Sequence, residues 1–144
     1  MRSILTKTLT ALIAIATLAV AAPAPAQAED SAYFVMTDIT REEFVVRLTD
    51  PGKIQHARDL VNGDTVDRPH IIGRILKRQT AYNPRWSYHL NSDTVDFFDV
   101  AIEVCDATIP YVEDHLDEAG GAFLPGLIWC GWTTRLLYEI PGPR

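Results

Sequence analysis

The chain has few of the features on which common catalytic sites are built. Beyond residue 28 it has three serines, none of them in a Gly-x-Ser-x-Gly elbow: Ser31, Ser87 and Ser92. Gly120 and Gly121 follow a predicted helix instead of opening one, so they are not a phosphate-binding loop. His70, His89 and His115 are scattered along the chain. We therefore predict no cofactor, no bound metal and no catalysis through these templates.

No apolar stretch is long enough to cross a membrane. The run from Leu9 to Ala22 has 14 residues, against the roughly 20 that a bilayer requires. Arg2 and Lys7 lie at its cationic start, and prolines followed by the small-residue tripeptide 26–28 end it. These are the three parts of a secretory signal peptide. We predict that residues 1–28 are cleaved and that residues 29–144 form a single secreted or periplasmic domain.

The predicted mature domain also has little positive charge. The signal peptide contains two of the 13 basic residues and none of the 19 acidic ones, which leaves eleven against nineteen and a net charge of −8. Nucleic acids and anionic membrane surfaces are recognised through clusters of basic residues. The composition therefore argues against nucleic acid and, after signal cleavage, against membrane as partners.

Cysteine occurs only twice, at positions 105 and 130. In an oxidising compartment an even number of cysteines indicates a disulfide, here closing a loop of 25 residues. Two buried free thiols are the alternative. A metal pair is disfavoured because neither Cys105 nor Cys130 belongs to a short ligand-spaced motif.

Hydrophobic periodicity predicts an α+β domain. Residues 33–36 and 43–49 have strand character, and Asp50 and Pro51 open a helix that Gly63 ends. Alternating residues in 98–105 indicate a half-buried strand with Phe98, Val100, Ile102 and Val104 on its apolar face. The remaining predictions are a second helix over 110–119 and strands over 70–78, 86–90, 127–132 and 134–140. The result is one small domain with two helices and a mostly antiparallel sheet of five or six strands.

Two charged segments are candidate partner-binding sites. In a helix, Glu113 lies four residues from Asp117, so like charges stack at a cost of about 0.3 kcal/mol per pair. A solvated face, a basic partner or a calcium ion remain open for this stretch. The basic segment contributes Arg74, Lys77 and Arg78. As a helix it has the pattern of a calmodulin target, but its β-branched residues favour a strand.

Tryptophans supply the remaining candidates. In an extended segment Trp129 lies on one side and Trp132 on the other, with Cys130. Both either pack around the disulfide or form a binding hot spot. Trp86 ends the segment 82–86, which together with 123–129 is a candidate exposed recognition loop.

Several long motifs resemble a known family. They are Arg68-Pro69-His70, Tyr82-Asn83-Pro84, residues 86–90 and the string from Phe97 to Trp132. Together they resemble the N-terminal domain of a calmodulin-binding protein family of social amoebae, which has small secreted bacterial relatives. The resemblance covers residues 32–140 and implies a calmodulin-binding activity. It implies no catalytic residues.

The charge of the domain leads to a different expectation about calmodulin. A net charge of −8 repels an acidic partner, and residues 71–78 are the only segment that could bind one. We predict that neither a peptide of residues 68–80 nor the whole domain binds calmodulin in a calcium-dependent manner. Calorimetry tests this prediction, and an affinity of about 1 μM, equivalent to about 8 kcal/mol, would contradict it.

Two functional hypotheses follow from the sequence. The first is a secreted, non-catalytic binding domain that recognises a protein or peptide, of which a protease inhibitor is one version. The alternative is a secreted hydrolase-type enzyme with a site assembled from dispersed residues, for which the candidates are His70, His89, Glu103 and Asp106. A pocket that gathers these side chains distinguishes the two.

Overall fold

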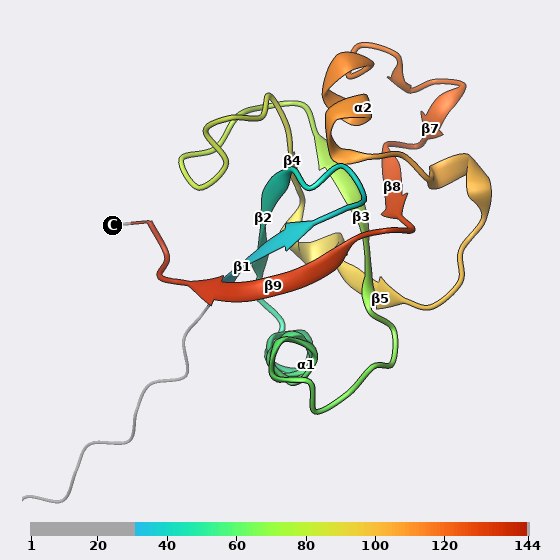
Figure 1. Cartoon of the computed structure of the whole chain (residues 1–144). Coiled ribbons are helices and arrows are strands. Elements are labelled where there is room, and N and C mark those ends of the chain that lie inside the picture. Colours follow the sequence, from blue (N-terminus) through green and yellow to red (C-terminus); the bar gives the residue numbers. More distant parts are fainter. Residues whose placement is uncertain (1–30, 144) are drawn as a thin grey trace, which may run out of the picture.

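The computed structural model describes residues 31–143 (Figure 1). The predicted signal peptide lies outside this range. Within it, no helix has the length and apolar character needed to pass through a bilayer. The described part contains two α-helices and nine strands, four of which have only two or three residues. The α+β prediction is confirmed.

The first sheet has the order β2-β1-β9 and is antiparallel throughout. Its strands are β1 (Ala32–Thr37), β2 (Glu43–Leu48) and β9 (Arg135–Ile140). Alternate residues face the core, so Phe34, Phe44 and Val46 are at most 1% exposed. Tyr33 pairs with Ile140, and the two ends of the described chain therefore meet at one end of this sheet.

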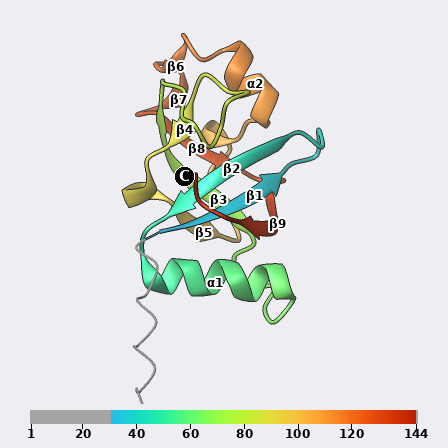
Figure 2. The ribbon, with the colours of Figure 1, turned by 90° about the vertical axis from the view of Figure 1, so that its left-hand side faces the viewer.

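Helix α1 (Pro51–Asn62) has the ends that its sequence predicts. Asp50 accepts a hydrogen bond from the Lys53 backbone N–H at 2.9 Å, and Gly63 ends the helix at a φ of 78°. The helix lies below both sheets in Figures 1 and 2, where Ile54 and Ala57 are buried.

The second sheet is built around β3 (His70–Leu76), which pairs with three strands. These are β4 (His89–Leu90), β5 (Asp96–Phe98) and β8 (Ile128–Gly131). Ile72 pairs with Asp96 of β5 and with Cys130 of β8, so these two strands lie on opposite edges of β3. The strand expected for 86–90 is shorter than predicted, because Trp86 and Tyr88 pack into the core before pairing begins.

Aromatic side chains fill the space between the two sheets. Trp129 is 1% exposed, with its ring centroid 5.6 Å from that of Phe44 and 5.9 Å from that of Tyr88. Burial raises the pKa of the Tyr88 phenol, helped by the charges of Glu113 and Asp38. The phenol stays protonated and donates to the carbonyl of Ile109 at 2.9 Å.

The second helix is shorter than its sequence suggests. α2 spans Ile109–Asp114 and ends at His115, whereas residues 110–119 were expected to be helical. The chain then turns into a short parallel pair, β6 (Ala119–Gly120) and β7 (Phe123–Pro125), which was not predicted. Ending the helix early avoids the repulsive helical pairing of Glu113 with Asp117. Single 3₁₀ turns occur at Ser92–Thr94 and Glu103–Cys105.

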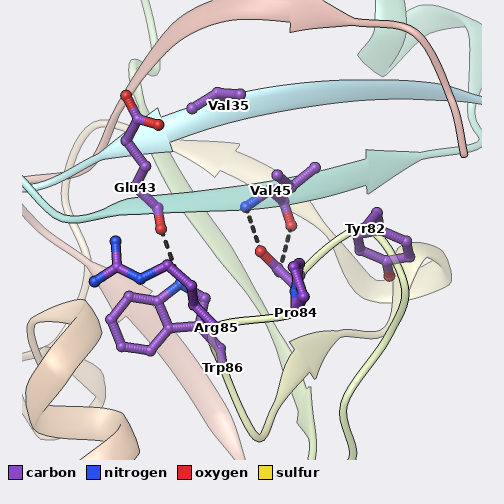
Figure 3. Close-up of a pocket in the computed structure, with 8 residues that line it drawn as sticks. Val35, Glu43, Val45, Tyr82, Pro84, Arg85 and Trp86 are labelled. Atoms are coloured by element: carbon purple, nitrogen blue, oxygen red, sulfur yellow. Dashed lines mark hydrogen bonds between the residues drawn. The ribbon is translucent and has the colours of Figure 1, made fainter.

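The outer edge of β2 is covered by side chains of the segment between β3 and β4. The Asn83 amide accepts a hydrogen bond from the Val45 N–H and donates one to the Val45 carbonyl, both at 2.8 Å (Figure 3). The Trp86 indole N–H donates to the Glu43 carbonyl at 2.8 Å. An uncovered strand edge is a template for pairing with another chain. Asn83 and Trp86 therefore protect the edge of the first sheet.

Replacing Asn83 with alanine should lower the free energy of unfolding by about 2–3 kcal/mol. The change removes two hydrogen bonds and leaves both backbone groups of Val45 without their partner at a site where Asn83 is 3% exposed. Urea denaturation followed by circular dichroism measures the loss. Gln79→Ala in the same segment is the matched control, because Gln79 is exposed, and should change stability by less than about 0.5 kcal/mol. Equal effects of the two changes would contradict the role assigned to Asn83.

Candidate functional site

The strand expected over 98–105 ends at Phe98, and the chain then crosses β3 from β5 to β8. We call residues 99–104 the crossover loop. A straight strand would place Cys105 about 23 Å from Phe98, at about 3.3 Å per residue. Cys105 instead lies with its Cα 5.1 Å from that of Cys130, on the opposite edge of β3. The prediction of a strand is therefore wrong beyond Phe98, because the disulfide and a straight strand are incompatible.

The two faces of this segment are also reversed. Ala101 and Cys105, expected on the polar side, pack with Phe98 and Cys130 in a small second core. The three β-branched residues expected inside are instead on the surface. Their exposed fractions are 81% for Val100, 70% for Ile102 and 59% for Val104. An exposed apolar cluster of this kind is typical of an interaction site.

The crossover loop is held at both ends. At its start, the Asp99 carboxylate accepts a hydrogen bond from the Arg68 backbone N–H at 2.7 Å. After its end, the Asp106 carboxylate accepts one from the Trp132 N–H at 2.9 Å, and the predicted Cys105–Cys130 disulfide is confirmed. A loop fixed in this way loses less conformational entropy when it binds a partner.

The tryptophans named as partner-binding candidates are mainly core residues. Trp129 and Trp86 are 1% and 6% exposed, and each donates its indole N–H to a backbone carbonyl. Neither ring is accessible to a partner. Trp132 is partly exposed and packs against the disulfide, which agrees with the alternative that we gave for it. The segments 82–86 and 123–129 are likewise anchored in the core, through Asn83 and Leu124.

The basic candidates do not form one patch. Arg74 donates to the Gly126 carbonyl at 3.0 Å, and the Lys77 ammonium donates to the Asp117 carbonyl at 3.3 Å. Arg78 lines a different hollow, described below. Residues 70–76 form the strand β3, which pairs along both edges. A calmodulin-type helix in this segment would require β3 to leave the second sheet.

The acidic candidates Glu113 and Asp117 also separate. The Glu113 carboxylate accepts hydrogen bonds from the Ser87 N–H at 2.9 Å and from the Ser87 hydroxyl at 2.6 Å. Asp117 follows the end of α2 and is exposed. No group of three or more His, Cys, Asp or Glu side chains in residues 31–143 is placed to hold a metal ion.

The four residues of the enzyme hypothesis do not converge. His70 and His89 lie at opposite ends of β3, because His89 pairs with Leu76, about 20 Å from His70 at 3.3 Å per residue. Each imidazole is bonded to a backbone carbonyl, His70 to Thr134 and His89 to Arg78. Glu103 and Asp106 belong to the end of the crossover loop, and the hollow beside His89 contains neither.

The crossover loop is therefore the strongest candidate site, and sequence reasoning missed it. The signal was present in the alternation itself, because a cysteine committed to a disulfide with buried Cys130 fixes which face points inward.

Comparison with known proteins adds the family. Neither the curated proteins nor the solved structures contain a significant match. A family model described as the N-terminal domain of calmodulin-binding protein 74 matches residues 30–143, which is nearly all of the described chain. The chain thus belongs to the family of calmodulin-binding protein 74 N-terminal domains.

Proposed function

We propose that this protein is an exported, non-catalytic domain that binds a protein or peptide partner through the crossover loop. The observation that carries the proposal is the exposure of Val100, Ile102 and Val104 on a loop whose base is fixed by a disulfide. Exposed β-branched side chains gain free energy when a partner buries them, about 25 cal/mol for each Å². Membership of a family of binding domains is consistent with this function.

The charges around the loop define the chemistry of the partner. Asp99, Glu103 and Asp106 alternate with or flank the three apolar residues, and Glu103 and Asp106 are exposed. A complementary partner would offer an apolar cleft with basic groups at its rim. The cleft of a secreted protease is one such surface. Calmodulin offers an acidic rim instead, so the expectation of no calmodulin binding is retained.

The experiment replaces the three exposed residues together. Val100→Thr, Ile102→Thr and Val104→Thr keep β-branching and remove apolar surface, and should weaken capture of the partner at least tenfold, about 1.4 kcal/mol. Stability should change by less than about 0.5 kcal/mol, because the side chains are exposed. Immobilised wild-type and triple-variant protein are exposed to secreted and host proteins, and bound proteins are identified and titrated.

Val66→Thr is the matched control. Val66 is 83% exposed in the loop between α1 and β3, so the same chemical change occurs away from the crossover loop. The control should capture the same partner as wild type. If the triple variant captures it equally well, the crossover loop is not the binding site.

A further inference from the structure

A second hollow of about 250 Å³ lies at the end of β3 remote from the crossover loop. It is formed where β2, the end of β3, β4 and the following 3₁₀ turn meet. Residues that give it its polar character are Arg47, Arg78, Tyr82, His89, Ser92 and Asp93. Because β3 separates the two regions by about 20 Å, this hollow is independent of the proposed protein-binding site.

Two guanidinium groups converge on this hollow without acidic partners. Within residues 31–143, neither Arg47 nor Arg78 forms an ion pair, whereas Arg58 and Arg85 pair with Glu139 and Glu42 at 2.6 and 2.7 Å. The Nε atom of Arg47 is buried and has no hydrogen-bond partner in the described part of the chain. In a protein with 19 acidic and 13 basic residues, such groups indicate a place for an external anion.

Tyr82 confirms that both charges are close to the same point. Burial raises the pKa of its phenol, while a hydrogen bond with Thr80 and the positive charges of Arg47 and Arg78 act in the opposite direction. The His89 ring lies 6.1 Å from the Tyr82 ring. Its Nδ1 bonds to the Arg78 carbonyl at 2.8 Å, and a carbonyl only accepts, so Nδ1 carries the proton. This bond fixes the backbone that carries Arg78.

The balance of charge in the hollow favours a monoanion. Arg47 and Arg78 contribute two positive charges, and Asp93, exposed at the rim, contributes one negative charge. A guanidinium group binds a carboxylate through two parallel hydrogen bonds. A dianion such as phosphate would meet repulsion from Asp93, so a carboxylate matches this hollow better.

An apolar hollow of about 160 Å³ adjoins the polar one, with Tyr82 lining both. Its apolar walls are Val35 of β1, Val45 of β2, Pro84 and Trp86, as Figure 3 shows. We propose that the two hollows together bind a carboxylate that carries an apolar substituent, with the carboxylate at Arg47 and Arg78. Such a carboxylate belongs either to a small organic acid or to the free C-terminus of a peptide.

Calorimetry with the purified protein tests this proposal, with 3-phenylpropionate as the probe. We expect a Kd of about 1 mM or lower, and binding at least tenfold weaker for the neutral 3-phenylpropionamide. Acetyl-Gly-Gly-Phe with a free and an amidated C-terminus separates the two sources. Tighter binding of the free-acid peptide than of 3-phenylpropionate indicates a peptide C-terminus, and the reverse order indicates a small acid. Equal binding of acid and amide, or no binding of 3-phenylpropionate at about 10 times the expected Kd, overturns the proposal.

Variants locate the carboxylate. Arg47→Gln and Arg78→Gln should each weaken binding about tenfold or more, and Asp93→Asn should strengthen it severalfold because a like charge is removed. Arg78 is exposed, so its variant remains folded even if Arg47→Gln does not. Arg74→Gln is the matched control, since Arg74 contacts Gly126 elsewhere, and should bind as wild type does. Wild-type affinity in Arg78→Gln would refute the site. The crossover-loop triple variant should bind the probe normally, which keeps this test separate from that of the proposed function.

Discussion

Replacing Trp129 with alanine should lower the free energy of unfolding by about 3–5 kcal/mol, one of the largest effects of any single change in this domain. The indole is 1% exposed and lies between residues of both sheets, with Phe44 on one side and Tyr88 on another. Its N–H also donates to the Ala107 carbonyl at 2.8 Å. The change removes these contacts, leaves a cavity and strands that carbonyl. Because natural domains are stable by only about 5–15 kcal/mol, the variant should be mostly unfolded at modest urea concentrations.

Two further variants separate the contributions of the indole. Trp129→Phe retains an aromatic ring but not the hydrogen bond, and should show an intermediate loss of about 1–2 kcal/mol. Trp132→Ala removes the same side chain three residues away, where the ring is partly exposed on the disulfide cluster. It should cost much less than Trp129→Ala. Circular dichroism is the appropriate probe, because each change alters the tryptophan fluorescence. Comparable losses at the two positions would contradict the central role of Trp129.

Opening the Cys105–Cys130 disulfide should cost about 3 kcal/mol, the entropy of closing a loop of this length in the unfolded chain. The double variant Cys105→Ala, Cys130→Ala should have the same stability as the reduced wild-type protein. Addition of dithiothreitol should lower the urea midpoint of the wild type and leave that of the double variant unchanged.

The same change should also impair partner capture. Without the bond, the end of the crossover loop is held only by the Asp106 hydrogen bond and by packing, so more entropy is lost on binding. We expect the folded double variant to bind the partner more weakly than wild type does under native conditions. Undiminished capture would show that the disulfide stabilises the domain without ordering its binding loop.

The local part of the fold was predictable from the sequence. Helix α1 is specified within a few residues of itself, by Asp50 at its start and Gly63 at its end, and β1 and β2 alternate as expected. The disulfide was also predictable, since two cysteines in an exported chain have one possible pairing.

What failed depended on contacts between distant residues. Alternation in 98–105 identified two faces but not which one is buried, and the position of Cys130 across β3 decides this. Trp129 could be a core residue or a hot spot by sequence alone, and its environment is built from β2 and the segment before β4. The convergence of Arg47 and Arg78 was invisible for the same reason, because 31 positions separate them and neither belongs to a motif.

The pairing of Tyr33 with Ile140 makes this domain easy to rewire. Since the first and last strands lie side by side and antiparallel, a short linker could join the two ends and new ends could be opened elsewhere. The segment around Val66 is suitable, because it is exposed and connects α1 to β3 without belonging to either hollow or to the crossover loop. A circular permutant cut there would keep every strand pairing. The same arrangement allows the domain to be inserted into a loop of a host protein with both proposed binding surfaces intact.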